Sequence, residues 1–230
     1  MAKKTDTTED KIQAVEHALS NTELFIEKHQ KIIMIVLGAI IVIILGYFGF
    51  KKLYLQPKEK EAQSQMFMAE KYFGQDSLKL ALNGDGNYLG FLAIINDYGI
   101  TKSANLAHYY AGICYLKLGQ FEKAIDYLEG FKSNELFVGP MAVGAIGDAN
   151  MELGRTDKAL EYYLKAADKN INDLTSPLFL LKAAWTYEKK NQFDKALELY
   201  KKIKTQFPKS AQSRDIDRYI AHVEGVLENK

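Results

Sequence analysis

Oxygen-bearing side chains alternate with glycines in segment 83–87, which reads NGDGN, and such a pattern could bind calcium. An EF-hand calcium loop needs glycine at its sixth position and a bidentate glutamate at its twelfth. Those positions are occupied by Tyr88 and Ile94. The segment therefore lacks the calcium motif and is interpreted as a turn between two helices.

Other side chains that could carry catalysis are scattered. The single cysteine, Cys114, excludes an internal disulfide, and its apolar surroundings indicate a small packed side chain. No glycine-rich phosphate loop occurs, and nothing supports a Ser/His/Asp or Cys/His nucleophile. The chain is therefore predicted to be no enzyme and to need no cofactor or metal. The histidines, which show no metal-ligand spacing, are His17, His29, His108 and His222.

Three similar stretches occur in the second half of the chain. They start at Gly112, Gly147 and Ala184, so their period is roughly 35 residues. Each opens on a small residue, which lets one helix approach another closely. A repeat that cannot bury its own apolar face must stack on its neighbours. The pattern predicts an all-α solenoid with an extended surface, which favours binding over catalysis. Each copy also carries a later alanine: Ala124, Ala159 and Ala196.

These copies resemble the tetratricopeptide repeat (TPR), whose period is about 34 residues. Asn191 stands where the family has an inter-helix glycine, and Asn150 stands where it has an aromatic residue. The resemblance implies three helix pairs over residues 105–210; any other antiparallel helical array is the alternative. The matching positions are Gly112, Tyr115, Gly119, Phe121, Ala124 and Leu128; Gly147, Leu153, Gly154, Ala159, Tyr163 and Ala166; Ala184, Tyr187, Phe193, Ala196, Tyr200 and Pro208.

An uninterrupted apolar run without a charge occupies residues 32–50. At about 1.5 Å of rise per residue it forms a helix roughly 28 Å long, which matches the hydrocarbon thickness of a bilayer. A cleaved signal peptide has a shorter apolar core and a small-residue cleavage site. This run follows 31 polar residues and ends in bulky groups, so it is interpreted as a retained transmembrane helix in the lipid bilayer.

The orientation of that helix does not follow from charge. Lys28 and Lys31 precede it, and Lys51, Lys52, Lys58 and Lys60 follow it, so a count of lysines places the large domain in the cytoplasm. Long domains translocate despite such a bias. Basic and acidic side chains are equal in number over residues 53–230, which excludes the positive footprint of a nucleic-acid-binding protein.

The organisation predicted along the chain has six parts. A polar N-terminal segment, 1–31, contains a short amphipathic helix over 9–19, and Ser20 with Glu23 forms a capping box that opens the spanning helix. Pro57 marks a break or kink after the membrane. The parts are 1–31, the span 32–50, a linker 51–58, a degenerate first repeat 59–104, the repeats 105–210 and a capping helix within 211–230.

In TPR proteins the first helix of each repeat lines the concave face. Transferred to this chain, the resemblance implies an apolar groove rich in methionine and aromatic residues, which suits an unfolded or helical polypeptide. The alternative is that several of these side chains are core, or are covered by the terminal helix. The predicted protein-binding residues are Tyr109, Ile113, Leu116, Met151, Leu181 and Trp185.

The whole plan, with a short polar N-terminus, one span and a TPR domain, is similar to the YfgM family of bacterial inner-membrane proteins. Residues 81–112 look like the version found in Bacteroidota. The resemblance implies a cytoplasmic N-terminus, a periplasmic TPR domain and an ancillary role at the SecYEG translocon. It also implies the membrane-anchored chaperone PpiD and unfolded client polypeptides as partners. The alternatives are a scaffold for envelope assembly or division and a cytoplasm-facing TPR receptor.

Overall fold

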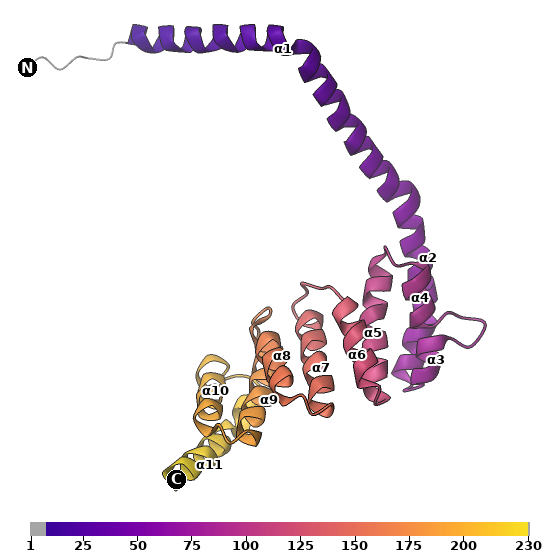
Figure 1. Ribbon diagram of the computed structural model, residues 1–230, viewed down its shortest axis with the longest axis vertical. Coiled ribbons are helices and arrows are strands. Elements are labelled where there is room, and N and C mark those ends of the chain that lie inside the picture. The colour runs from indigo at the N-terminus through magenta and orange to yellow at the C-terminus, as the bar shows by residue number, and fades with distance from the viewer. Residues whose placement is uncertain (1–7, 230) are drawn as a thin grey trace, which may run out of the picture. The chain divides into compact units, whose positions relative to one another are not determined.

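The computed structural model describes the backbone of residues 8–229 and the side chains of residues 28–229, and the described chain contains helices and no strand (Figure 1). This confirms the all-α prediction. The chain divides into two compact units, one ending at Pro57 and the other beginning at Lys58.

The first unit is built on one helix, α1 (Thr8–Phe50). The separate helix predicted over 9–19 and the helix start predicted at Ser20 are wrong, because α1 runs through both positions. The sequence from Thr8 to Lys31 contains neither glycine nor proline, so nothing in it ends a helix. Among the described residues, one helical stretch, Lys28–Gly74, is long and apolar enough to cross a membrane, and its apolar window is unburied.

The break predicted at Pro57 is replaced by a change of helix type. Lys51–Leu55 forms a π-helical turn, η1, whose following residue Gln56 donates its N–H to the carbonyl of Lys51. The next helix, α2 (Gln56–Gly74), contains Pro57 in its first turn. Proline lacks an N–H and crowds the carbonyl four residues earlier, so a wider turn and a first-turn position accommodate it without ending the helix. The linker predicted over 51–58 is therefore helical.

The second unit is an array of helix pairs. Two short helices, α3 (Leu78–Asn83) and α4 (Phe91–Asp97), complete the region predicted as a degenerate repeat. The terminal helix predicted after residue 210 is a short 3₁₀ turn, η2 (Gln212–Asp215), followed by α11 (Ile216–Glu228). The repeat helices between them are α5 (Lys102–Lys117), α6 (Phe121–Gly130), α7 (Val138–Glu152), α8 (Thr156–Asp168), α9 (Thr175–Lys189) and α10 (Phe193–Gln206).

Small residues allow the two helices of a repeat to approach closely. A Cβ added to Gly112 on α5 would lie 2.5 Å from Cγ of Leu128 on α6. A Cβ added to Gly147 on α7 would lie 2.7 Å from the ring of Tyr163 on α8. Both distances are too short for real contacts. The small residues that open the copies are therefore packing positions, as the spacing predicted.

The turn between the helices of each repeat uses a left-handed backbone conformation. Gly119 and Gly154 have φ of 72° and 73°, and Asn191 takes the same place in the third repeat with φ of 56°. Asparagine is one of the few side chains that visit this region routinely. The departure from glycine at Asn191 therefore preserves the turn.

A carboxylate from α2 closes the N-terminus of α5. Glu59 accepts hydrogen bonds from the backbone N–H of Lys102 (2.7 Å) and of Ser103 (3.1 Å), and from Ser103 Oγ (2.6 Å). The first N–H groups of a helix have no partner within it, and they favour a negative charge. Glu59 thereby fixes the start of α2 against the start of the first repeat.

Candidate functional site

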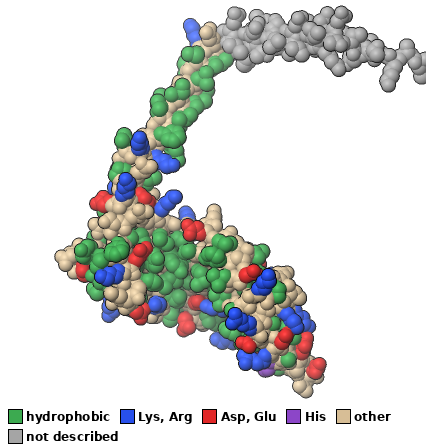
Figure 2. All heavy atoms as spheres, turned by 180° about the vertical axis from the view of Figure 1, so that it is seen from behind, with side chains coloured by type: hydrophobic (Ala, Val, Ile, Leu, Met, Phe, Trp, Pro, Cys, Tyr) green, Lys and Arg blue, Asp and Glu red, His purple; other side chains and the backbone are tan. Residues whose placement is uncertain are grey.

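Two adjoining hollows lie along the first helices of the repeats. One has a volume of about 340 Å³ and the other about 520 Å³. They share Asp148, Met151, Tyr163 and Lys182, so we treat them as one central groove. Figure 2 shows apolar side chains gathered on one face of the array toward its N-terminal half, and charged ones concentrated toward its C-terminal end. The other groove residues are Leu116, Lys117, Gly119, Phe121, Glu152, Trp185, Thr186 and Lys189.

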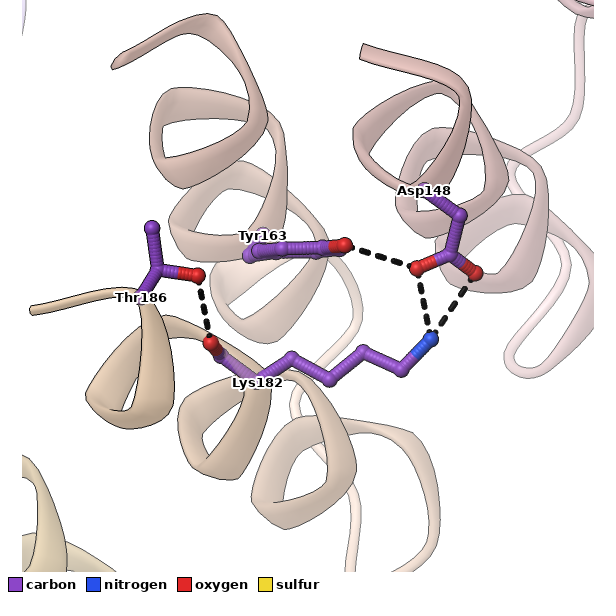
Figure 3. Close-up of polar contacts among 4 residues, drawn as sticks. All are labelled: Asp148, Tyr163, Lys182 and Thr186. Atoms are coloured by element: carbon purple, nitrogen blue, oxygen red, sulfur yellow. Dashed lines mark hydrogen bonds and ion pairs between the residues drawn. The ribbon is translucent and has the colours of Figure 1, made fainter. Parts of the chain in front are cut away.

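An ion pair between α7 and α9 crosses the groove (Figure 3). Lys182 Nζ lies 2.6 Å and 2.8 Å from the two carboxylate oxygens of Asp148, and Tyr163 OH donates to Asp148 Oδ1 at 2.8 Å. The side chains of Lys182 and Asp148 are 29% and 33% exposed. Thr186 Oγ1 donates to the carbonyl of Lys182 at 2.8 Å. Both charges are thus held in fixed positions and neutralise each other.

The phenol of Tyr163 stays protonated beside this pair. Burial, followed by the negative charge of Asp148 and the hydrogen bond to it, raises the pKa of Tyr163 well above its usual value. The Lys182 ammonium also lies 5.6 Å from the centre of the Tyr163 ring, within cation–π range. The groove floor therefore presents a fixed polar cluster with no net charge.

Apolar surface flanks this polar cluster. Trp185 is 45% exposed, and its ring lies 6.1 Å from that of Tyr219 on the terminal helix α11. Half-buried Met151 lies on α7, where its sulfur is 3.9 Å from Lys189 Nζ. A large exposed aromatic ring beside a flexible thioether is typical of a surface that binds apolar side chains of a polypeptide.

The predicted protein-binding residues divide into three groups. Met151 and Trp185 line the 340 Å³ hollow, and Leu116 joins Met151 in the adjoining one. Tyr109 and Ile113 are half-buried against a small core cluster of α6 and α7. Leu181 is buried, with 9% of its surface exposed, and packs in the core of the later repeats. The structure therefore brings Leu116, Met151 and Trp185 together and places Leu181 in the core.

The sequence prediction missed Lys182 and Tyr163 as groove residues. A signal for the ion pair was present, because Asp148 is the only charged residue between Leu136 and Met151. Lys182 is likewise the only charged residue between Leu178 and Tyr187. A lone charge on an apolar helix needs a partner when it is partly buried.

The loop that resembled a calcium site is an internally hydrogen-bonded turn. Asp85 Oδ1 accepts from the N–H of Asn87 (2.9 Å) and of Tyr88 (2.8 Å), while Oδ2 accepts from Tyr72 OH (2.7 Å). Gly84 and Gly86 have φ of 80° and 92°, which only glycine adopts readily. Across residues 28–229, no group of three metal-binding side chains is placed to hold an ion.

The thiol of Cys114 is buried in the interior of the array, where burial raises its pKa to about 12. Reactive cysteines are thiolates in exposed, positively charged surroundings. Cys114 therefore serves as a packed side chain, as predicted.

Comparisons with known proteins agree with this architecture. A tetratricopeptide-repeat family model matches residues 106–135 and 179–210, and a second tetratricopeptide-repeat model matches residues 142–168. Curated proteins give no match.

Two solved structures from Podosopora anserina, both of nearly identical TPR-like repeats of a kinesin light chain, are similar in fold. The first has 14% identity and a TM-score of 0.56, and the match covers 75% of this chain and 89% of that one. The second, a single-substitution variant, has 15% identity and a TM-score of 0.55 over the same shares. The chain therefore carries tetratricopeptide repeats within an all-helical array of TPR-like fold, and such repeats indicate a protein–protein interaction module.

Proposed function

We propose that the central groove binds an extended or helical segment of a partner polypeptide, and that the helix containing residues 32–50 anchors the protein in a membrane. The observation that carries the groove proposal is the exposed ring of Trp185 beside Met151, flanking the neutral Asp148–Lys182 pair. Apolar side chains of the partner would contact the ring and the thioether. The fixed polar groups beside them would hydrogen-bond to a backbone group or a polar side chain of the partner at one position of the segment.

The partner proposed is the export machinery of a bacterial inner membrane. Its support is the similarity of the whole plan to the YfgM family, which implies the SecYEG translocon and the chaperone PpiD. In this proposal the repeats lie on the periplasmic side and assist export or pass clients to the chaperone. A groove that tolerates varied apolar side chains suits an unfolded client or a chaperone segment.

Fluorescence of Trp185 tests the groove directly, because it is the only tryptophan. Titrating the full chain in detergent with the periplasmic region of PpiD, and separately with an unfolded client, should shift its emission. Calorimetric titration should show that Trp185→Ala weakens binding by about 2 kcal/mol or more, roughly 30-fold.

The matched control is Tyr88→Ala, which removes an aromatic ring of similar exposure, 47%, from a loop outside the groove. Circular dichroism should show both variants fully helical. A Trp185→Ala protein that is folded and binds normally would contradict the groove proposal. Binding of the client but not of PpiD would retain the groove and remove the chaperone from the proposed partners.

A further inference from the structure

The loops that connect one helix pair to the next lie along one edge of the array, which we call the loop edge. It comprises residues 98–101, 131–137 and 169–174. In Figure 1 the loops before α5 and before α7 emerge at the end of the helices where α2 begins. The turns within the repeats lie at the opposite end.

The loop edge presents large apolar side chains to solvent, whereas the opposite edge does not. Ile171 and Leu174 are 68% and 62% exposed. At the opposite edge, residues 118–120, 153–155 and 190–192 contribute no large exposed apolar side chain. Large apolar side chains exposed along one edge and absent from the other make that edge a candidate contact surface. The remaining large exposed apolar residues of the loop edge are Ile100, Leu136 and Phe137.

Hydrogen bonds between successive loops hold this edge in place. Asn170 Nδ2 donates to the carbonyls of Asn134 and Glu135, both at 3.0 Å, and Asn172 Nδ2 donates to the carbonyl of Leu136 at 3.2 Å. The loop before α7 is also tied to helix α5, because Lys132 donates its N–H to Asn105 Oδ1 at 2.9 Å. The apolar side chains are therefore displayed on a fixed backbone and lie outside the core of the array.

Chain connectivity limits how far the start of the second unit can lie from the apolar run. Lys58 Nζ donates to the carbonyl of Asp97 at 3.3 Å, and Glu59 caps α5. The second unit thus begins at the loop edge. Phe50, the last residue of the run, is eight positions before Lys58, and eight residues reach at most about 28 Å. Chain connectivity therefore keeps Lys58, where the second unit starts, within that distance of the end of the run.

We infer that the loop edge docks on the lipid interface of the membrane that holds the span, with Ile171 and Leu174 entering the headgroup region. This inference rests on the proposed membrane anchor. Tethering makes the contact intramolecular in effect, so a modest apolar area suffices. The edge carries both lysines and acids, such as Lys132 and Lys169 beside Glu135 and Asp173. Docking should therefore depend little on anionic lipid or on salt.

The test places an environment-sensitive fluorophore on an introduced cysteine, Ile171→Cys, in the full chain reconstituted into phosphatidylcholine vesicles. Buried Cys114 stays unlabelled, and the unmodified chain taken through the same labelling checks this. The matched control is Gln120→Cys, an exposed residue in a turn at the opposite edge. Vesicles with and without nitroxide-labelled phosphatidylcholine measure contact with lipid, and flotation measures anchoring.

We expect the vesicles to carry the protein, and nitroxide lipid to quench the fluorophore at position 171 and not at position 120. Leu174→Cys should repeat the result at position 171. A chain that floats with equal, unquenched emission at both positions overturns the docking and leaves the anchor intact. Emission shifted to the blue without quenching, and rising with protein density, overturns it in favour of a second copy of the chain. A chain that fails to float overturns the anchor and the docking together.

Discussion

At the scale of single residues, the polar part of the groove consists of charged groups that neutralise one another. The Asp148 carboxylate receives both the Lys182 ammonium and the Tyr163 hydroxyl. Because these groups come from three different helices, their positions report on the packing of two neighbouring repeats. Removing one of them should therefore affect stability and binding together.

Replacing Tyr163 by phenylalanine tests this cluster through pH. At pH 8 the variant should be less stable by about 1.5–3 kcal/mol, because one hydrogen bond to a charged group is lost. The pKa of Tyr163 is raised in the folded protein, so the folded form keeps its proton after the unfolded form has lost it at pH of about 10. Its contribution to stability is complete below pH of about 10 and declines above. Urea unfolding from pH 8 to 11 should therefore show the difference between the two proteins shrinking; a constant difference would contradict the role of Tyr163.

The thiol of Cys114 should not react with a disulfide reagent in the native protein at pH 8. Its pKa of about 12 leaves almost no thiolate, and its side chain is fully buried. The absorbance of the coloured thiol that the reagent releases on reacting with Cys114 should rise only when denaturant unfolds the array. Rapid reaction without denaturant would mean that α5 opens locally.

At the scale of elements, small residues set how closely the two helices of a repeat pack, and residues in the left-handed conformation form the turn between them. Both features could be predicted from the sequence, since Gly112 and Gly147 recur one period apart and each faces its partner helix directly. Helix ends were harder to predict. Ser20 resembles a cap and Pro57 a break, yet α1 runs through the first and a π turn accommodates the second.

The groove prediction failed at Leu181 for a related reason. Leu181 and Trp185 are four residues apart and share a stripe of α9, so spacing alone assigns both to the groove. The twist between neighbouring helices decides which of them is buried. That twist depends on the packing of all the repeats and is not contained in the spacing within one helix.

Adding bulk at Ala159 should destabilise the array. Ala159 on α8 is fully buried, and its carbonyl would lie 3.3 Å from a Cβ added at Gly147. Ala159→Leu should cost about 1–3 kcal/mol. The neighbouring Lys158→Leu, at an exposed position, should change little. Thermal unfolding followed by circular dichroism compares them, and equal losses would argue against close contact of α7 and α8 at Ala159.

The turn at Asn191 offers a test of backbone conformation. Its φ of 56° penalises side chains other than asparagine and aspartate. Asn191→Ala should lower the free energy of unfolding by about 1 kcal/mol, whereas Asn191→Gly should not. Chemical unfolding at neutral pH measures both. Identical behaviour of the two variants would show that the turn relaxes to another conformation.

At the scale of the whole molecule, the apolar helix and the repeats are separate compact units, and the proposed function needs both in one chain. A reporter active only in the cytoplasm, fused to the C-terminus, should be silent if the repeats are exported. The lysine count around residues 32–50 favours the opposite orientation by a small margin. Strong reporter activity would assign the protein to the cytoplasm-facing receptors and remove the periplasmic partners.

The packing of each helix on its predecessor also bears on how the protein is made. Contacts in a repeat array are local in sequence, and local contacts form quickly. The earliest packing helix, α2, directly follows the apolar stretch in the chain and already holds Glu59, whose carboxylate accepts hydrogen bonds from the first N–H groups of α5. Each newly synthesised helix pair can therefore pack on a repeat that has already folded. Such a chain can assemble progressively while its C-terminal part is still being synthesised or threaded through a channel, with no need to wait for α11.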